Sequence, residues 1–261
     1  MGVHQHHRNG DADAAYWRDV AASWRPSAAT SFLRAYSDAV NRRLLARWLP
    51  PRVDRVLKTD AFDEAVGAGL VPLLAARATT VVTVDVAADI VAAAHARYPA
   101  LVATVADVRD LPFPDDAFDA ILSNSTLDHF ESRDELRAGI RELARVLRPG
   151  GVLVITLDNP VHPLVALRNR LPYGLLRRFW IAPYAYGVTA GPRRLRVLLR
   201  DAGLEVEELA FVMHFPRIVA RLIGAIGGRR LLGLLMSFEM LGRLPTRALT
   251  GQFVAARAVR R

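Results

Sequence analysis

The chain has 261 residues, of which 52% are hydrophobic and none is cysteine. This composition predicts a globular fold with a sizeable core, and the lack of cysteine excludes disulfides, thiolate metal sites and a cysteine nucleophile. The net charge of +9 is concentrated in residues 161–261, where seventeen arginines and five acids leave +12. A basic segment of this kind can bind nucleic acid, an anionic membrane surface or an acidic substrate. The alternative is that it forms a solvated face of the protein.

Residues 1–12 are predicted to be a disordered tail. They are polar and contain His4, His6 and His7 but no apolar stretch. A tail is favoured over a weak metal site at these histidines, and no metal ion is expected. Because no secretory signal opens the chain and no apolar run reaches the ~18 residues of a membrane span, a cytoplasmic location is expected.

Residues 13–50 are predicted to form an N-terminal helical cap of two helices. Trp17, Val20 and Trp24 recur at helical spacing, and so do Leu33, Val40, Leu44 and Trp48. The pair Pro50-Pro51 ends the segment.

Residues 51–160 alternate short apolar runs with helical patterns. The expected strands are 55–59, 81–86, 101–106, 120–123 and 152–157, and the expected helices are 64–77, 87–97 and 132–147. Ser132 and Glu135 form a capping box at the start of the last helix. This order favours an α/β fold with a doubly wound parallel sheet.

Residues 161–261 are read as the C-terminal part of the same domain, with loops on the substrate side. A helix is expected at 192–202 and strands at 204–212 and 252–259, with a helical insertion over 215–247. Four aromatic residues are candidates for an acceptor pocket, although core packing is favoured: Tyr173, Trp180, Tyr184 and Tyr186.

Polar side chains follow the predicted strands at the edge where ligands of such sheets bind. Asp60, Asp85, Asp107 and Asn124 each follow or close a strand. An acid after the second strand accepts hydrogen bonds from ribose hydroxyls in adenosine-binding sheets, and Asp85 fits this position. The alternative is that Asp85 caps the next helix.

A longer pattern adds a family resemblance. It consists of Leu111-Pro112-Phe113, then Phe118-Asp119, then Leu127 with His129-Phe130, then Leu147-Arg148-Pro149-Gly150-Gly151. In this combination the chain resembles the type 11 branch of the class I, S-adenosylmethionine-dependent methyltransferases, over Val53 to Leu157.

The resemblance implies a Rossmann-like sheet of seven strands with the last one antiparallel, and S-adenosylmethionine as the cofactor. It also implies that Asp107 accepts from the adenine amino group, that the Val108 backbone contacts the ring, and that Asp85, with Val86 beside it, holds the ribose. The methionine end of the cofactor is then lined by residues 124–127, among them Asn124, Ser125 and Leu127.

The first turn departs from the family pattern. Lys58 stands where the family has an acid, Asp60 stands where the first glycine would be, and Gly67 and Gly69 come late. The expected explanation is a rebuilt turn in which Asp60 or Glu64 faces the cofactor's amino group, with Gly67 nearby. The same departure argues against a nicotinamide enzyme, which needs a Gly-x-Gly-x-x-Gly turn here.

Methyl transfer needs mainly alignment of the acceptor, and a base where a hydroxyl must lose its proton. His129 is the candidate base, with a structural histidine as the equal alternative. The expected function is methyl transfer to an oxygen or nitrogen of a small molecule. A non-catalytic adenosyl-binding protein is the alternative, and a nucleic-acid methyltransferase ranks third because residues 124–127 lack an Asn/Asp-Pro-Pro-Tyr/Phe motif.

The insertion at 215–247 contains two amphipathic helices, the second over Leu231 to Leu241 with Glu239 and Arg243 paired four residues apart. A lid over the acceptor or a homodimer interface is favoured, and peripheral membrane contact is the alternative. Tyr16 and Trp17 are candidates for a lid over the cofactor, with packing onto the sheet as the alternative.

Overall fold

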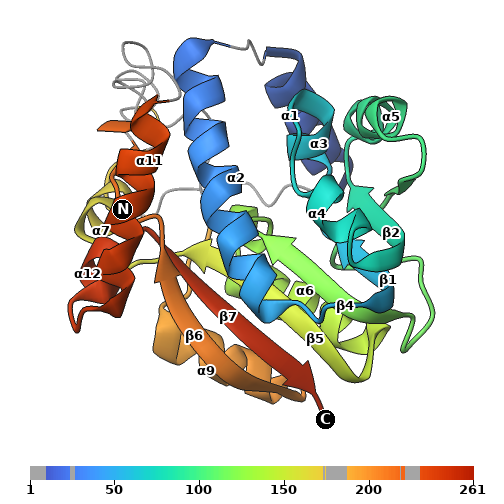
Figure 1. Cartoon of the computed structure of the whole chain (residues 1–261). Helices are drawn as coiled ribbons and strands as arrows, with labels where there is room; N and C mark the ends of the chain where they lie inside the picture. The colour runs from blue at the N-terminus through green and yellow to red at the C-terminus, as the bar shows by residue number, and fades with distance from the viewer. Residues whose placement is uncertain (1–9, 24–26, 173, 175–186, 218, 221–229) are drawn as a thin grey trace.

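A seven-stranded sheet forms the centre of the computed structural model, which describes residues 10–23, 27–172, 174, 187–217, 219–220 and 230–261 (Figure 1). The strand order is β3-β2-β1-β4-β5-β7-β6, and β7 is antiparallel to both of its neighbours. This topology confirms the predicted fold. The strands are β1 Val53–Lys58, β2 Ala78–Asp85, β3 Val102–Val105, β4 Phe118–Asn124, β5 Leu147–Asp158, β6 Leu204–Val212 and β7 Phe253–Arg260.

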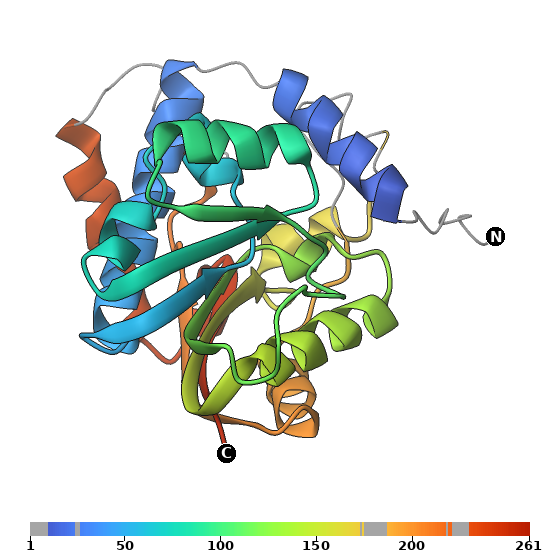
Figure 2. The same ribbon diagram turned by 90° about the vertical axis from the view of Figure 1, so that its right-hand side faces the viewer.

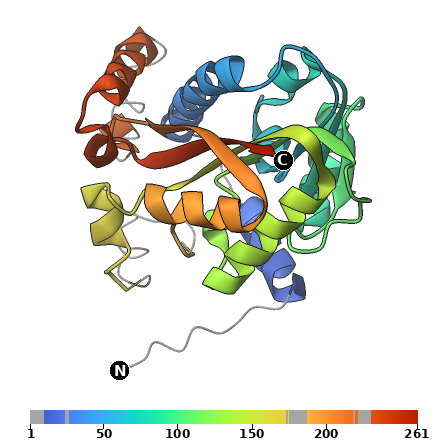
Figure 3. The same ribbon diagram turned by 90° about the horizontal axis from the view of Figure 1, so that it is seen from below.

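Helices cover both faces of the sheet (Figure 3). One face carries α2 Ala28–Trp48, α3 Phe62–Val66, α4 Val71–Ala75, α5 Ala88–Arg97 and α11 Arg230–Ser237. The other carries α6 Arg133–Val146 and α9 Pro192–Asp201. The shorter or peripheral elements are α1 Gly10–Ser23, η1 Leu127–His129, α7 Pro163–Arg168, η2 Phe238–Arg243 and α12 Arg247–Thr250.

The core consists of two apolar layers that the sheet separates. Val56 of β1 and Val154 of β5 face the layer with α2, whereas Leu57 and Ile155 face the layer with α6 and α9. Successive side chains of a strand point to opposite faces, so strands buried on both faces need continuous apolar runs. The runs in β4 and β5 meet this requirement.

The two helices predicted over 13–50 are present as α1 and α2, but α1 begins at Gly10, within the predicted tail of residues 1–12. Helix α2 is fixed at both ends. Ser27 and Thr30 form a capping box at its start. At its end, the Arg77 guanidinium donates to the carbonyl oxygens of Leu45, Ala46 and Leu49. Leu45 also accepts from the Leu49 backbone N–H. Carbonyls at the end of a helix lack further backbone donors, so the Arg77 cation supplies hydrogen bonds there.

The helix predicted over 64–77 is wrong as a single element, because α3 and α4 are two helices of five residues each. Gly69 lies between them with φ +57°, a conformation that glycine adopts without strain. The Glu64 carboxylate accepts from the Leu70 backbone N–H at 2.8 Å, so this side chain takes the place of the broken helical bonding. The capping box of Ser132 and Glu135 at α6 is confirmed.

The insertion differs from its prediction in its second half. The helix expected over Leu231 to Leu241 ends at Ser237 and continues as the 3-10 helix η2, in which residues four apart do not share a face. Glu239 therefore does not pair with Arg243. It accepts from the Tyr36 hydroxyl at 2.6 Å and from the backbone N–H groups of Met213 and His214.

Residues 218 and 221–229 of the insertion lie outside the described residues, as do His4, His6, His7 and the aromatic residues Tyr173, Trp180, Tyr184 and Tyr186. Among the helices that are described, none combines the length and the apolar character needed to cross a membrane.

Candidate functional site

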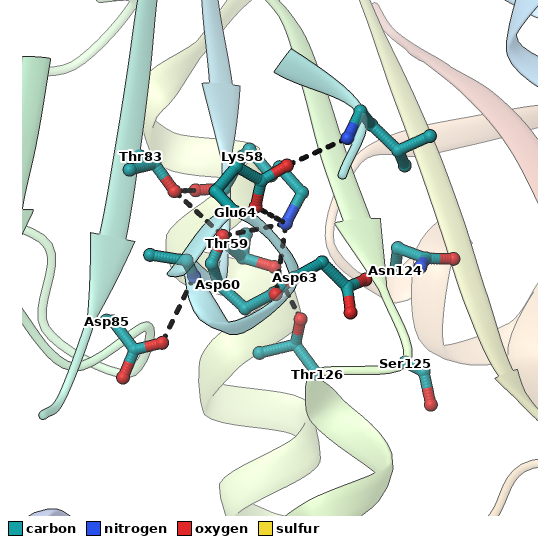
Figure 4. Close-up of polar contacts among 12 residues, drawn as sticks. Lys58, Thr59, Asp60, Asp63, Glu64, Thr83, Asp85, Asn124, Ser125 and Thr126 are labelled. Atoms are coloured by element: carbon teal, nitrogen blue, oxygen red, sulfur yellow. Dashed lines mark hydrogen bonds and ion pairs between the residues drawn. The ribbon is translucent and has the colours of Figure 1, made fainter. Parts of the chain in front are cut away.

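The carboxyl ends of β1 and β4 mark the point where the chain leaves the sheet in opposite directions. After β1 it enters α3, on the face of α2, and after β4 it passes through η1 to α6 on the opposite face. A crevice at such a switch point is the usual ligand site of an open α/β sheet. Figure 4 shows the polar residues that gather there.

Lys58, the last residue of β1, is fully buried at this edge. Its Nζ lies 3.0 Å from Oδ1 of Asp60 and 2.8 Å from Oε2 of Glu64, and it donates to the Asp60 carbonyl oxygen at 2.8 Å. Burial alone would lower the pKa of Lys58, but Asp60 and Glu64 raise it above its usual value. Lys58 is therefore a permanent cation inside the turn, and two carboxylates compensate its charge.

Gly67 and Gly69 follow the turn, and Gly69 makes room for the ion pair of Lys58 and Glu64. A Cβ on Gly69 would lie 2.2 Å from Oε1 of Glu64, so only glycine leaves room for the buried carboxylate. A Cβ on Gly67 would lie 2.8 Å from Cδ of Arg34 on α2, which places the open side of Gly67 against α2. The cofactor contact expected near Gly67 stays a prediction, whereas Gly69 serves the packing of Glu64.

Asp60 keeps one carboxylate oxygen unused. Oδ1 contacts Lys58, whereas Oδ2 is buried and has no hydrogen-bond partner among the described residues. Burial raises the pKa of Asp60 to about 7; Lys58 opposes the shift, and Asp63 and Glu64 add to it. A buried acceptor without a partner indicates a place where a donor from outside the chain can bind.

Asp85 closes β2 and joins the first turn to the start of α5. Its Oδ2 accepts from the Ala61 backbone N–H at 3.1 Å and its Oδ1 from the Ala87 N–H at 3.0 Å. Burial raises the pKa of Asp85 against the effect of these hydrogen bonds. Each carboxylate oxygen can accept a second hydrogen bond, so Asp85 retains capacity for two ligand hydroxyls. The alternative that Asp85 caps the next helix is wrong, because the N-cap of α5 is Ala87 and no side chain caps it. The role of Asp85 as a ligand acceptor stays a prediction.

The loop after β4 forms the opposite wall. Thr59 contacts Ser123 at 3.1 Å and Thr126 at 2.8 Å, which ties the two strand ends together. Ser125 has φ +53°, and its backbone N–H donates to the carbonyl and hydroxyl oxygens of Thr156. A non-glycine residue in this region is uncommon and often lies at a functional site. The structure thus brings Asn124 and Ser125 to the edge, as predicted.

Two apolar residues that were also predicted to contact the cofactor, Leu127 and Val86, are buried or half-buried. The Leu127 side chain is fully buried in the core beside α6, so only its backbone remains for a ligand. Val86 is half-buried directly after β2.

Asp128 and His129 follow within η1. Asp128 is 1% exposed; its Oδ2 accepts from the Ser125 hydroxyl at 2.9 Å and from the Asp158 N–H at 3.1 Å. Burial raises the pKa of Asp128, and the neighbouring His129 opposes the shift. Oδ1 of Asp128 lies 3.9 Å from Nε2 of His129, and the Trp17 ring packs edge-on against the imidazole with centroids 4.7 Å apart.

Asp107 follows β3, and its carboxylate is bound by Arg109 of the same loop. Arg109 Nε lies 3.0 and 2.9 Å from the two carboxylate oxygens of Asp107, and Arg109 also pairs with Glu135 at 2.7 Å. The Val108 side chain is buried in the core. A hydrogen bond from an adenine amino group to Asp107 would have to share the carboxylate with Arg109, so this contact stays a prediction.

Several residues of the recognised pattern hold the fold rather than a ligand. Asp119 accepts from the backbone N–H groups of Asp54 and Arg55 at 2.9 and 2.6 Å, which fixes the start of β1. Arg145 donates to the carbonyls of Leu111 and Phe113 and pairs with Glu142. These contacts join the loop after β3 to the end of α6, and β4 to the start of β1.

Three residues contribute to this edge in ways that the sequence did not predict: Lys58 as an anchor, Thr59 and Asp128. Their position next to strand ends was the available signal. The ring nitrogens of His214 bond to Thr250 and to the Phe211 carbonyl, which suits a structural role. Over the described part of the chain, no group of three or more histidines and acids is arranged to hold a metal ion.

Part of the chain is similar to known proteins. Residues 62–155 match the model of the methyltransferase domain family. A probable S-adenosylmethionine-dependent methyltransferase of Mycobacterium tuberculosis is 29% identical over 165 residues, which cover 63% of this chain and 55% of the relative. A demethylmenaquinone methyltransferase of Beutenbergia cavernae is 33% identical over 134 residues, 50% of this chain and 52% of that protein. The chain thus matches about half the length of these curated relatives.

Among solved structures, the fold is similar to that of a geranyl diphosphate C-methyltransferase from Streptomyces coelicolor. The TM-score is 0.59 at 17% sequence identity, and the match covers 85% of this chain and 77% of the other. At this identity the likeness supports the fold alone.

Proposed function

Because residues 62–155 belong to the class I, S-adenosylmethionine-dependent methyltransferases, we propose that this chain transfers the methyl group of S-adenosylmethionine to an oxygen or nitrogen of a small-molecule acceptor. The observation that carries the proposal is the crevice edge itself. It presents buried carboxylates with acceptor capacity left over, Asp85 at the end of β2 and Asp60 after β1.

These residues fit the cofactor. Asp85 accepts hydrogen bonds from the ribose hydroxyls, and the unused oxygen of Asp60 suits a cationic donor. The backbone of residues 124–127 lines the methionine end, at the strained Ser125. The bound cofactor supplies a methyl group that its sulfonium already activates, so the protein's main contribution is to align the acceptor and keep water out.

His129 is proposed to take the proton of an acceptor hydroxyl. It lies at the carboxyl edge of β4, one residue after the buried Asp128 and against Trp17. A base in this position contributes ~10²–10⁴ to the rate. An acceptor nitrogen that is already unprotonated would not need it.

A small molecule is favoured as acceptor for two reasons. The relative from Beutenbergia cavernae is named for demethylmenaquinone, and residues 124–127 lack the Asn/Asp-Pro-Pro-Tyr/Phe motif associated with base modification. The second candidate function is a non-catalytic adenosyl-binding protein. The observation that favours it is Lys58, a buried cation at the place of the family's acid.

The test is calorimetric titration with S-adenosylmethionine and S-adenosylhomocysteine, followed by turnover on a panel of small acceptors. Asp85→Ala should weaken both ligands about tenfold or more, because a hydrogen bond to a charged acceptor contributes ~1.5–3 kcal/mol. Asp54→Ala, at the exposed opposite end of β1, is the matched control and should leave both affinities unchanged. Lack of binding by the folded wild-type protein would refute the proposal, and binding without turnover would favour the second candidate.

A further inference from the structure

We propose that Asp60, and not Glu64, binds the cationic α-amino group of the cofactor's methionine moiety, through its unused oxygen Oδ2. The inference rests on the proposed function and names the residue that makes the site specific for the amino-acid end of the ligand. It is carried by the charges of the first turn, by the exposure of the two candidate carboxylates and by the way the Asp60 backbone is held.

Among the described residues around the first turn, carboxylates outnumber cations. Around it lie Asp38 and the cations Arg34 and Arg42 on α2, Lys58 on β1, Asp60 in the turn, and Asp63 and Glu64 on α3. Asp85 of β2 adds a further carboxylate nearby, bonded to two backbone N–H groups. Lys58 lies within 3.0 Å of Asp60 and Glu64, and Arg34 pairs with Asp63. Such an excess of buried carboxylates is relieved by protonation or by binding a cation.

Exposure distinguishes the two carboxylates. The Glu64 side chain is fully buried, with Oε1 bonded to the Leu70 N–H and Oε2 against Lys58. The Asp60 side chain is 20% exposed, and its Oδ2 has no hydrogen-bond partner within the described part of the chain. In Figure 4, Asp60 lies on the side of the turn toward Asp85 at the end of β2, and the side chains of Glu64 and Lys58 overlap.

The backbone of Asp60 is fixed in advance. Its carbonyl oxygen accepts from Lys58 Nζ at 2.8 Å and from the Thr83 hydroxyl at 2.8 Å. A turn that is held on two sides needs little reordering when a ligand arrives, so more of the interaction energy appears as affinity. Lys58 thus replaces the family's acid as the anchor of the turn, and Asp60, two residues later, supplies the negative charge.

The experiment compares two ligands on three proteins by titration calorimetry. S-adenosylhomocysteine carries the α-amino group, and 5′-methylthioadenosine is a nucleoside thioether that lacks the amino-acid moiety. The proteins are the wild type, Asp60→Asn and Glu64→Gln, each checked for a cooperative thermal unfolding transition. Asn keeps the size of the side chain and removes its charge.

For Asp60→Asn we expect the affinity for S-adenosylhomocysteine to fall about tenfold or more, while the affinity for 5′-methylthioadenosine changes less than about twofold. In Glu64→Gln the ratio of the two affinities should stay that of the wild type, even if a loosened turn weakens both ligands. Equal losses for both ligands in Asp60→Asn, or no loss at all, would overturn the assignment, as would a ratio that falls only in Glu64→Gln. If the wild type binds neither ligand, the proposed function fails first.

Discussion

Asp128 and His129 are neighbours in the chain with opposite surroundings. The Asp128 carboxylate is buried and fixed by Ser125 and by the Asp158 backbone, whereas the His129 ring lies under Trp17 at the edge of the crevice. A base must reach the acceptor, so His129 is the better placed of the two for proton transfer.

Replacement of this histidine tests the base directly. His129→Ala should lower kcat by ~10²–10⁴ on a hydroxyl acceptor from the panel, with the affinity for S-adenosylhomocysteine nearly intact. His95→Ala, on the exposed side of α5, should leave kcat unchanged. A loss below tenfold would assign His129 a structural role and leave alignment of the acceptor as the mechanism.

The charge of Asp60 should also be visible in the pH dependence of stability. Burial raises the pKa of Asp60 to about 7, with Lys58 acting against the shift and Asp63 and Glu64 with it. Between pH ~4 and ~7 the folded state holds a proton that the unfolded state has lost, so the unfolding free energy falls as pH rises through this window. Asp60→Asn has no carboxyl group at this position and therefore does not lose this stability. The unfolding free energy of the variant minus that of the wild type should be larger at pH 8 than at pH 5, by about 1–3 kcal/mol.

The measurement is urea unfolding of both proteins at the two pH values, without ligand. The comparison removes the contributions of Asp38, Asp85 and Asp128, whose pKa values burial also raises, because both proteins contain them. A difference in unfolding free energy that is equal at pH 5 and pH 8 would show that Asp60 titrates normally in the folded state.

The sequence predicts where the site residues lie, but it does not predict their contacts. Asp85 and Asn124 close strands, and the parallel order of the strands brings them to one edge, so sequence alone places them. The pairing of Asp107 with Arg109 depends on rotamers and on Glu135 of a distant helix. The anchoring of Lys58 depends on a glycine five residues after Glu64. Periodicity carries no signal for such contacts.

Among the elements, α1 lies next to the carboxyl edge of the sheet. Its contacts reach α5 through the exposed pair of Arg18 and Asp89 at 3.8 Å, and η1 through Trp17 against His129. Figure 2 shows α1 beside the ends of the strands. The interpretation of Trp17 as part of a lid therefore stays open to test.

Truncation of the tryptophan provides that test. Trp17→Ala should increase the dissociation rate of S-adenosylhomocysteine several-fold in stopped-flow measurements, because a cover that has lost its apolar contact opens more often. Arg18→Ala removes only an exposed ion pair, which contributes little, and is the control. Unchanged dissociation with a lowered unfolding temperature would show that Trp17 serves packing alone.

Helices and strands that depend on a long periodic segment were predicted correctly. Those whose bounds depend on a single side-chain contact were not. Helix α6 has both a capping box and an apolar face, and its start at Arg133 follows from Ser132. The segment 64–77 has helical periodicity as well, but Gly69 and the buried Glu64 break it into α3 and α4. In the insertion, the bonds of Glu239 to Tyr36 and to the backbone after β6 override its expected pairing within one helix.

At the scale of the whole molecule, the basic character of residues 161–261 coincides with exposed apolar side chains. They are Leu164 and Leu167 on α7, Leu234 on α11, Met240 on η2 and Leu249 on α12. Basic, apolar surfaces of this kind suit an anionic bilayer, a second copy of the chain or a lid. Glu239 holds η2 against α2 and β6, so this segment is fixed at one end of the sheet (Figure 1).

Sedimentation with vesicles distinguishes these partners. We expect little protein to pellet with either neutral or anionic phospholipid vesicles at low and moderate salt, because the lid and dimer interpretations are favoured. Pelleting with anionic vesicles alone, reduced by salt and by the double change Leu234→Ser and Met240→Ser, would establish membrane contact instead. The double change Leu164→Ser and Leu167→Ser is the matched control for the neighbouring α7.

Lys58 is the chain's single lysine and is fully buried. Amine-reactive reagents therefore meet no lysine side chain on the surface while the first turn stays closed. Acylation at Lys58 requires that the turn opens, so the rate of labelling measures how often this small part of the protein unfolds by itself. Mass spectrometry of one modified residue could follow that opening in an otherwise unaltered protein, with and without a ligand in the crevice.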